Sequence, residues 1–456
     1  MTTELSVRET AIPGLLVLTL PVHGDSRGWF KENWQRAKMT SLGLPDFGPV
    51  QNNMSFNAAP GTTRGVHAEP WDKLVSSAHG RYFGVWVDLR SGPGFGAVFT
   101  TVVDESTAVF VPRGVGNAYQ TLDADVVYSY LVNDHWSEAS IPDYSYVNLA
   151  DPTLAIDWPI PLDQAELSDK DRAHPALADA RRVEPRQTLI LGGNGQLGRA
   201  LGEVFPQAVR VDIDVLDLTD PAAVAAWPWA DFDVVVNAAA WTDVDGAESD
   251  EGRRGAWTAN AGVPATLARL ALAHRHTLVH VSSDYVFDGT RSGWTEDDAL
   301  APLSVYGQAK AAGDLAVSVV PRHYLLRTSW IVGDGKNFLR TMADLARRGV
   351  SPSVVSDQIG RLTHTSNLAA AIAHLLAVRA PYGTYNCTDG GDPVSWADIA
   401  QAVFAANGRD PADVTPVTTA DYYAGKPGIA PRPRLSVLDL AKLEATGYTV
   451  PQFPLA

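Results

Sequence analysis

The chain has 456 residues, a formal net charge of −16 and a pI near 5.1. At this length one hydrophobic core is not enough, so we expect at least two domains. The negative charge argues against binding to nucleic acid or to an anionic membrane surface, and no run approaches the ~20 apolar residues of a membrane span. The first ten residues lack the apolar core of a signal peptide, which predicts a cytoplasmic location. Because Cys387 is the single cysteine, an internal disulfide and a cysteine-based metal cage are excluded, and we predict no metal site.

The first 160 residues consist of short apolar or alternating runs separated by glycine and proline. This pattern predicts a fold built only of β-strands, as a sandwich or barrel. The charged, alanine-rich segment 168–186 predicts a short helix and then an interdomain linker. We place the boundary at Pro185, which gives units of residues 1–185 and 186–456. Strands are expected within residues 15–20, 73–76, 82–89, 97–103, 108–111 and 126–132.

Three polar stretches, residues 25–32, 51–55 and 63–70, interrupt the apolar pattern of the first half. A barrel interior lined with such groups is a ligand site. Taken singly, His67 is more often a surface histidine or a satisfied core histidine. Lys73 could equally be a solvated charge. Only the set as a whole indicates chemistry.

The second half opens on an apolar run that ends in a glycine cluster. Gly193, Gly195 and Gly198 fit G-x-G-x-x-G, and Gly192 in place of Gly193 gives the looser G-x-x-G-x-x-G spacing. Such glycines permit a tight turn, and the N–H groups of the helix that follows can bind a pyrophosphate. By itself the motif is weak evidence, because a plain strand-to-helix turn has roughly even odds.

Later features support a dinucleotide site. Asp212 ends the next apolar run, about twenty residues on, where a carboxylate can accept the ribose hydroxyls. A third apolar run ends in the small residues 238–240, against which a cofactor can lie flat. Strands that alternate with helical segments, such as 264–274 and 368–378, predict a parallel, doubly wound Rossmann-type sheet. The expected cofactor-binding residues are Gly192, Gly193, Gly195, Gln196, Leu197, Gly198, Asp212, Ala238, Ala239, Ala240, Tyr306 and Lys310.

A fourth apolar run ends in Ser283 and Asp284, and the pattern Tyr306-x-x-x-Lys310 follows it. Residues at i and i+4 share a helix face, so Lys310 can favour the phenolate of Tyr306 and lower its pKa from ~10. Such a tyrosine can donate a proton to a ketone oxygen. A lone Tyr-x-x-x-Lys is usually an exposed pair, but this one follows a glycine turn and a polar strand end.

Four motifs of the second half are more specific than the glycine turn: Asn237-Ala-Ala-Ala-Trp-Thr-Asp-Val-Asp-Gly-Ala-Glu248, Ser282-Ser-Asp-Tyr-Val-Phe-Asp-Gly289, Leu326-Arg-Thr-Ser-Trp330 and Ser356-Asp-Gln-Ile-Gly360. With them, the second half resembles the extended short-chain dehydrogenases and, among these, the dTDP-4-dehydrorhamnose reductase family. The resemblance implies a ketone reductase with Ser283, Tyr306 and Lys310 as its catalytic triad. Asp284 and Trp330 would bind the sugar nucleotide.

The cofactor implied by this resemblance is NADPH or NADH. Asp212 favours NADH, because a carboxylate repels a 2'-phosphate. Arg199 and Arg210 are close in sequence to the same region and leave NADPH open. The residues do not decide between the two.

The first half carries Arg64-Gly-Val-His67, Val111-Pro-Arg-Gly114, Asp157-Trp-Pro159 and Leu167-Ser-Asp-Lys-Asp171. With these motifs it resembles the dTDP-4-dehydrorhamnose 3,5-epimerase family, which has a cupin-like jelly roll. The resemblance implies that His67 is the general base, oriented by Asp151, and that Lys73 lies near the developing enolate oxygen. The expected substrate-binding residues, two of them arginines for the diphosphate, are Arg27, Gln51, Asn53, Arg64 and Asn117.

Two regions depart from the epimerase pattern. Asn117 stands where relatives carry a second histidine. In the region of residues 132–137, relatives use a tyrosine as the catalytic acid, and this chain offers His135 as the candidate acid. Two alternatives therefore stay open: epimerisation at C3 alone on another deoxysugar, and a first half that only binds substrate.

The preferred hypothesis is a bifunctional enzyme of dTDP-L-rhamnose biosynthesis. It acts on a dTDP-4-keto-6-deoxyhexose, and its all-β cupin-like jelly roll is followed by an α/β Rossmann-type domain of the extended short-chain dehydrogenase kind. We expect it to form a homodimer through the jelly roll.

Overall fold

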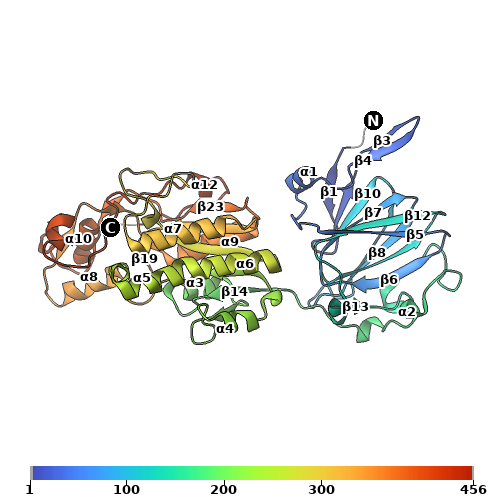
Figure 1. Ribbon diagram of the computed structural model, residues 1–456, viewed down its shortest axis with the longest axis horizontal. Coiled ribbons are helices and arrows are strands. Elements are labelled where there is room, and N and C mark those ends of the chain that lie inside the picture. Colours follow the sequence, from blue (N-terminus) through green and yellow to red (C-terminus); the bar gives the residue numbers. More distant parts are fainter. Residues whose placement is uncertain (1–3, 454–456) are drawn as a thin grey trace. The chain divides into compact units, whose positions relative to one another are not determined.

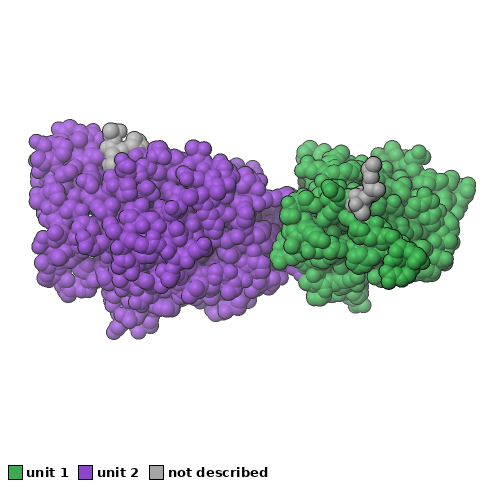
Figure 2. Space-filling view, turned by 90° about the horizontal axis from the view of Figure 1, so that it is seen from above, with its two compact units in different colours: residues 1–185 green, residues 186–456 purple. Residues whose placement is uncertain are grey.

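The computed structural model describes residues 4–453. The chain divides into two compact units, residues 1–185 and 186–456, which Figure 2 shows in different colours. Within residues 4–453, no helix combines the length and the apolar character needed to cross a membrane.

The first unit is built from two sheets in which all strand pairs are antiparallel (Figure 1). This arrangement confirms the predicted all-β fold. In sheet order, the first sheet contains β1 (Ser6–Glu9), β2 (Leu16–Thr19), β10 (Thr107–Val111), β7 (Lys73–His79), β12 (Val126–Val132) and β5 (Gln51–Asn57). The second contains β13 (Ser145–Tyr146), β6 (Thr63–Ala68), β11 (Val115–Thr121), β8 (Tyr82–Asp88) and β9 (Val98–Val103).

Large apolar side chains fill the space between these two sheets. Val75 and Tyr128 point inward from the first sheet, and Tyr82 and Trp86 point inward from the second. Inward and outward positions alternate along a strand, so one face of each sheet is apolar. A separate hairpin, β3 (Val22–Asp25) with β4 (Gly28–Lys31), and helix α1 (Arg36–Ser41) complete the start of the unit.

The end of the first unit lies against its second sheet. The segment contains η1 (Glu138–Asp143), η2 (Pro152–Leu154), α2 (Asp169–Arg172) and η3 (Leu177–Asp179). Beyond these elements, Val183 is buried, and its backbone N–H donates to the Leu89 carbonyl at 2.8 Å. The predicted short helix is present, but the predicted linker is wrong over most of its length, because residues up to 183 are packed onto the first unit.

The second unit contains a six-stranded parallel sheet with helices on both faces (Figure 1). Consecutive side chains of a strand point to opposite faces. Ile190 accordingly packs with α3 (Gln196–Val204) and α9 (Thr365–Ala377), whereas Leu189 packs with α6 (Val263–His274) and α7 (Val305–Ser318). The predicted Rossmann-type fold is confirmed. In sheet order the strands are β15 (Val209–Val211), β14 (Gln187–Leu191), β16 (Phe232–Asn237), β17 (Thr277–Ser283), β18 (His323–Thr328) and β23 (Gly383–Asn386).

The helices and short elements of this unit lie between the strands of the sheet along the chain and after the last of them. The helices are α3 (Gln196–Val204), α4 (Pro221–Ala226), α5 (Asp250–Trp257), α6 (Val263–His274), α7 (Val305–Ser318), α8 (Phe338–Arg347), α9 (Thr365–Ala377), α10 (Trp396–Ala406), α11 (Thr419–Tyr423) and α12 (Ala441–Glu444), with a π-helical turn η6 (Thr258–Gly262) and short 3-10 turns η4 (Trp229–Asp231), η5 (Gly246–Glu248), η7 (Asp284–Val286) and η8 (Pro411–Asp413). The unit also contains three short strand pairs: β19 (Ile331–Val332) with β22 (Thr363–His364), β20 (Ser353–Val355) with β25 (Thr415–Val417), and β21 (Ile359–Gly360) with β24 (Val394–Ser395).

Candidate active sites

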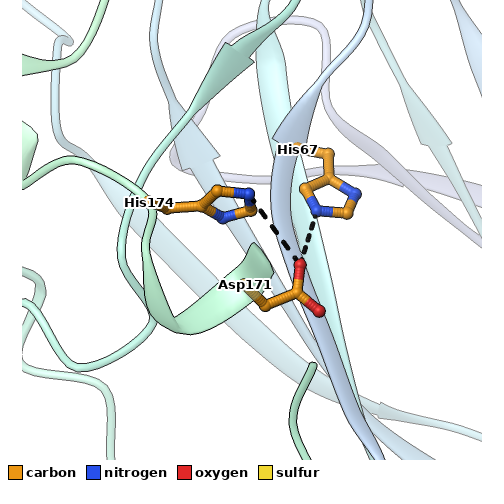
Figure 3. Close-up of side chains that lie close together, drawn as sticks. All are labelled: His67, Asp171 and His174. Atoms are coloured by element: carbon orange, nitrogen blue, oxygen red, sulfur yellow. Dashed lines mark hydrogen bonds and ion pairs between the residues drawn. The ribbon is translucent and has the colours of Figure 1, made fainter. Parts of the chain in front are cut away.

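His67 lies on β6 and forms a hydrogen-bonded pair with a buried carboxylate (Figure 3). Its Nε2 is 2.9 Å from Oδ1 of Asp171, which belongs to α2, 104 residues further along the chain. Ser168 caps α2 and donates its hydroxyl to the other oxygen of Asp171 at 2.9 Å. Burial alone would raise the pKa of Asp171, but the hydrogen bond and charge of His67 bring it below its ordinary value.

This pairing fixes which nitrogen of His67 can act as a base. An ionised carboxylate can only accept hydrogen bonds, so Nε2 of His67 carries the proton that it shares with Asp171. In the neutral ring the lone pair is then on Nδ1. The arrangement therefore presents Nδ1 as the proton acceptor and stabilises the imidazolium that forms.

The expectation that Asp151 orients His67 is wrong. The carboxylate of Asp151 caps η2, where it accepts from the backbone N–H of Thr153 at 2.8 Å, and it also accepts from the N–H of Leu177 at 2.6 Å. Through these contacts, Asp151 caps η2 and ties it to the segment that follows α2. The aspartate that contacts His67 is Asp171, in a motif whose residues had no assigned role.

Lys73 of β7 reaches across from the first sheet to the second. Its Nζ lies 2.7 Å from Oε1 of Glu69 and 3.0 Å from Oδ1 of Asn117, which is directly opposite His67 in the pairing of β6 with β11. Asn117 also donates its amide to the hydroxyl of Tyr128 at 3.1 Å. Lys73 is therefore a buried cation that contacts Asn117, the residue paired with His67 on the neighbouring strand.

Tyr130 was missed by the sequence analysis, although it belongs to this group. Nζ of Lys73 lies 5.7 Å from the centre of its ring. Burial, and then the charge of Glu69, raise the pKa of Tyr130 to about 12. The phenol is thus neutral at physiological pH and can act as a proton donor. His135, the candidate acid expected from the sequence, is exposed, and its backbone N–H is bonded to Asp134.

The predicted substrate-binding residues on β5 and β6 surround the same region. Asn53 is directly opposite Tyr130 in the pairing of β5 with β12, and its side-chain oxygen accepts from Gln51 at 2.9 Å. Arg64 is exposed and donates to Asn57 at 3.3 Å. Arg27 lies apart from this group, on the β3–β4 hairpin, where its guanidinium contacts Asp25 of the same hairpin.

In the second unit, the glycine turn joins β14 to α3 and leaves no room for side chains. Gly192 has a φ of +75°, and a Cβ there would lie 2.7 Å from the backbone nitrogen of Ala239. A Cβ on Gly198 would lie 2.1 Å from the carbonyl oxygen of Gly192. The N-cap of α3 is Gly195, and no side chain caps it, so the first N–H groups of the helix remain available to an anion.

A cleft of about 1090 Å³ lies at the carboxyl ends of the parallel strands. Most of the predicted residues line it, whereas Gly193 and Gly198 shape the turn from behind. Gly193 packs against Arg210, and Gly198 against Gly192. The predicted residues that line the cleft are Gly192, Gly195, Gln196, Leu197, Asp212, Ala238, Ala239, Ala240, Ser283, Asp284, Tyr306, Lys310 and Trp330.

Two charged residues border this cleft on the side of the glycine turn. The carboxylate of Asp212 accepts from the backbone N–H groups of Asn194 and Ile213 at 2.8 and 2.9 Å. Arg199, on α3, donates to the carbonyls of Asn194 and Asp334. A carboxylate and a guanidinium thus both line the cleft, so the structure, like the sequence, is compatible with either NADH or NADPH.

The catalytic residues expected in this unit come together at the ends of β17 and α7. The hydroxyl of Ser283 donates to Asp284 at 2.9 Å, and Nζ of Lys310 donates to the carbonyl of Val281 at 2.7 Å. Tyr306 is one turn before Lys310 on α7.

The pKa of Tyr306 is raised in this structure, not lowered as the sequence predicts. Burial, and then the charge of Asp284, raise the pKa of Tyr306 above its ordinary value, and the hydrogen bond to Ser283 opposes this only in part. Tyr306 is therefore a neutral phenol that can donate a proton. Burial lowers the pKa of Lys310 to about 8, against the opposing charge of Asp314. Burial raises the pKa of Asp284 to about 6.

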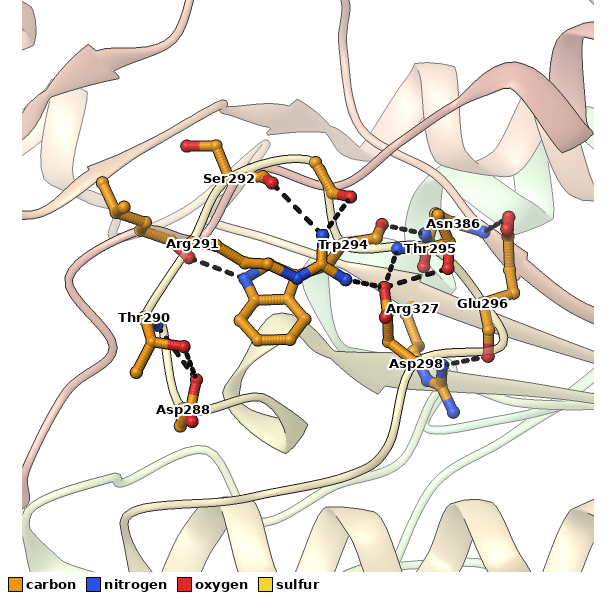
Figure 4. A network of polar contacts seen from close by, with 12 residues as sticks. Asp288, Thr290, Arg291, Ser292, Trp294, Thr295, Glu296, Asp298, Arg327 and Asn386 are labelled. Carbon is orange, nitrogen blue, oxygen red and sulfur yellow. Dashed lines mark hydrogen bonds and ion pairs between the residues drawn. The ribbon is translucent and has the colours of Figure 1, made fainter.

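The loop that follows β17 is held in place by a polar network (Figure 4). Arg327 of β18 donates to the Glu296 carbonyl at 2.9 Å. It also donates to Asp314 at 3.0 Å. The Glu296 carboxylate in turn accepts the backbone N–H of Asn386 at 2.8 Å. Trp330, which lines the cleft, has a φ of +44° and stacks on Trp396, with ring centres 3.9 Å apart. Both tryptophans line the cleft, so their stacking fixes one of its walls.

The chain matches two family models in succession. Residues 9–179 match the dTDP-4-dehydrorhamnose 3,5-epimerase model, and residues 186–454 match the RmlD substrate binding domain. A protein RmlC homolog from Streptococcus pyogenes serotype M6 is 51% identical over 38% of this chain and 90% of its own length. The dTDP-4-dehydrorhamnose reductase of Aggregatibacter actinomycetemcomitans is 37% identical over 56% of this chain and 91% of its own length.

The chain belongs to both families. Its second unit, the reductase unit, is similar to the crystal structure of a dTDP-4-dehydrorhamnose reductase from Clostridium acetobutylicum, with 36% identity and a TM-score of 0.54 over 58% of this chain and 94% of that one. It is also similar to the Bacillus anthracis reductase in complex with NADP, with 31% identity and a TM-score of 0.54 over 59% and 95% of the two chains. The first unit is the epimerase unit.

The pairing of His67 with Asp171 predicts unequal effects of two aspartate substitutions. Asp171→Asn should lower solvent deuterium exchange into the 4-keto sugar nucleotide by about 10²-fold or more, because the ionised partner of the base is lost. Asp151→Asn is the matched control and should exchange at nearly the rate of the parent chain. Proton NMR of the sugar in deuterium oxide measures both rates. Equal rates in the two variants would contradict the assignment of Asp171.

The lowered pKa of Lys310 predicts a pH dependence of the reductase unit. In the free enzyme the ammonium charge is present below a pH of about 8 and is lost as the pH rises through it. The kcat/KM for ketone reduction, which reports groups of the free enzyme, should therefore fall above this pH. Lys310→Arg keeps the charge and should move the fall to higher pH. A flat profile of the parent chain across this range would count against the role of Lys310.

Proposed function

We propose that the chain converts dTDP-4-dehydro-6-deoxyglucose to dTDP-L-rhamnose in two steps. The epimerase unit inverts C3 and C5 of the sugar, and the reductase unit then reduces the ketone at C4 with NAD(P)H. The observation that supports this most strongly is the presence, in one chain, of a His67–Asp171 base and a Ser283–Tyr306–Lys310 cluster. We keep the cytoplasm as the expected location.

In the proposed epimerisation, Nδ1 of His67 removes the proton from the carbon next to the C4 ketone. Asp171 stabilises the imidazolium that results, through the proton on Nε2. The electrons of the broken C–H bond move to the ketone oxygen. Lys73 supplies the positive charge near the resulting enolate oxygen, and Asn117 holds Lys73 in position at 3.0 Å.

Inversion also requires a proton donor on the opposite face of the sugar. We propose that Tyr130 is this donor. Tyr130 lies on the sheet opposite the one that carries His67. Its pKa of about 12 keeps it protonated until the enolate forms. Donation leaves a phenolate next to the Lys73 ammonium, which favours that charge.

The residues of the reductase unit fit a dinucleotide. The uncapped N-terminus of α3 and the closed turn at Gly192 would hold the pyrophosphate, with Asp212 near the ribose of the adenosine. When bound, NAD(P)H supplies the hydride for C4 of the sugar. Tyr306 donates its proton to the ketone oxygen, and Ser283 positions that oxygen by a hydrogen bond. Lys310 then stabilises the phenolate that Tyr306 becomes.

Separate sites predict that each half-reaction can be removed alone. Tyr306→Phe should abolish sugar-dependent oxidation of NAD(P)H and leave deuterium exchange by the epimerase unit unchanged. His67→Ala should lower that exchange by about 10²-fold or more. It should leave reduction of a supplied dTDP-4-dehydro-L-rhamnose unchanged.

Absorbance of NAD(P)H and NMR of the sugar follow these two activities in the same samples. Circular dichroism of each variant provides the control for folding. Loss of both activities in a folded Tyr306→Phe chain would refute the proposal of independent sites.

The role of Tyr130 predicts that exchange and inversion can be separated. In Tyr130→Phe, His67 should still remove a proton and return deuterium to the same face, so exchange continues. The inverted sugar should not accumulate, because no proton arrives on the opposite face. Tyr82→Phe, at a buried tyrosine whose hydroxyl has no hydrogen-bond partner among the described residues, is the matched control and should invert at the parent rate. Inversion at the parent rate in Tyr130→Phe would exclude this tyrosine and leave the acid to another group.

We further propose that the epimerase unit forms the homodimer. The edge strand β5 exposes Met54 and Phe56 at 67% and 61%, and the β3–β4 hairpin exposes Phe30 at 65%. An exposed apolar edge strand is an adhesive surface that a second copy can cover. The hairpin also carries Arg27, whose contact with Asp25 leaves the guanidinium largely exposed and able to meet a diphosphate in the neighbouring copy.

Light scattering on the full chain tests the dimer. We expect twice the 48.9 kDa mass of one chain. Met54→Ser combined with Phe56→Ser should shift this mass toward the monomer, whereas Leu315→Ser, at an exposed position on α7, should not. A monomeric parent chain at all concentrations would contradict the proposal.

A further inference from the structure

Three potential metal ligands meet beside β6 (Figure 3). His67 comes from the strand, Asp171 from α2, and His174 from the turn that follows α2. Their ligand atoms all lie within 4.8 Å of one another. Oδ1 of Asp171 is 2.9 Å from Nε2 of His67 and 3.9 Å from Nε2 of His174, so the carboxylate stands between the two rings.

The mechanism proposed above leaves His174 without a role. Its side chain is only 6% exposed, and neither ring nitrogen makes a hydrogen bond of normal geometry in the described part of the chain. The Gly65 backbone is close enough only to oppose in part the lowering of the His174 pKa by burial. The His174 ring stacks on Tyr146 with centres 4.8 Å apart and meets the His67 ring edge to face at 5.2 Å. A buried polar group without a partner is costly and calls for an explanation.

Although the sequence predicts no metal site, we propose that His67, Asp171 and His174 form a binding site for a divalent transition metal ion such as Zn²⁺, and that its occupancy silences the epimerase unit. Two imidazoles and a carboxylate are an established ligand set for such ions. Ligand atoms at about 2.1 Å from a tetrahedral Zn²⁺ are roughly 3.4 Å apart. Two of the three separations, 2.9 and 3.9 Å, lie on either side of this value, and the third is at most 4.8 Å.

The unequal burial of the three side chains indicates a metal site with an open coordination position. Asp171 and His174 are almost fully buried, whereas 32% of the His67 side chain is exposed. The fourth position of the ion would therefore face the substrate region and take water or a substrate oxygen. Only one carboxylate offsets the two charges of the ion. The Lys170 ammonium lies near Tyr146, at 5.5 Å from its ring centre, so we expect reversible rather than structural binding.

Binding of the ion would remove the base by moving a proton. The ion takes the lone pair of Nε2 of His67, which requires the proton on that nitrogen to leave. Solvent takes up this proton and supplies another to Nδ1, so the metal-bound imidazole remains neutral. Nδ1 no longer has a lone pair for the C–H proton. This consequence rests on the proposed role of His67, whereas metal binding itself does not.

Zn²⁺ titration of the chelator-treated full chain tests the effect on activity. Deuterium exchange by the epimerase unit should fall to a residual level with one ion bound per chain, and a chelator should restore it. Reduction of supplied dTDP-4-dehydro-L-rhamnose, measured in the same samples, should be unaffected. Equal inhibition of both units, or no inhibition of exchange, would overturn the proposed silencing.

Visible absorption of bound Co²⁺ tests the site without any assay of activity. The parent chain should give the intense bands of a tetrahedral Co²⁺ complex with nitrogen and oxygen ligands. His174→Gln, and independently His174→Asn, should raise the Co²⁺ and Zn²⁺ concentrations for half-saturation at least tenfold. His79→Gln, at an exposed histidine of β7, is the matched control and should bind as the parent does.

The two measurements keep the site and the function apart. Unchanged metal affinity in both folded His174 variants, or no Co²⁺ bands in the parent chain, would overturn the metal site. Normal Co²⁺ bands in a chain that catalyses no exchange would instead refute the proposed epimerase activity and leave the metal site standing.

Discussion

The contact between His67 and Asp171 is the interaction on which the first unit depends. It joins a strand of the second sheet to a short helix 104 residues later, and it can form only if the intervening segment folds back over that sheet. A buried carboxylate without a partner would be strongly unfavourable, so the contact couples the fold of this segment to the state of the base. Ser168, which caps α2 and donates to Asp171, extends the same coupling to the start of the helix.

The reductase unit also contains buried charges that need partners, and other residues supply them. Lys310 and Asp314 lie one turn apart on α7, both buried, and Arg327 of the neighbouring strand pairs with Asp314 at 3.0 Å. Because these charges satisfy one another beneath the cleft, a cation can remain next to Tyr306 without exposure to water. In both units the reactive side chain is therefore partly buried against a set of buried polar groups, and these neighbours determine which atom carries the proton.

The sequence predicted those parts of the structure that follow from apolar pattern and from motifs. The strand 126–132 and the helices near 264–274 and 368–378 lie where the pattern indicated. Strands β5, β6 and β11 were missed, because polar groups such as Asn53 and His67 face inward and break the apolar alternation. The partner of His67 could not be chosen from sequence, since only the fold brings Asp171 rather than Asp151 to it. Tyr130 was hidden for the opposite reason, because it lies in an apolar run that is typical of core.

The order and independence of the two proposed steps can be measured in a single reaction. The full chain is incubated in deuterium oxide with dTDP-4-dehydro-6-deoxyglucose and unlabelled NADPH, and the product is analysed by NMR. We predict dTDP-L-rhamnose with deuterium at C3 and C5, from exchange at the His67 site, and protium at C4, from the cofactor. A reduced sugar with protium at both C3 and C5 would contradict the account, because it would show that reduction proceeds without epimerisation by the first unit.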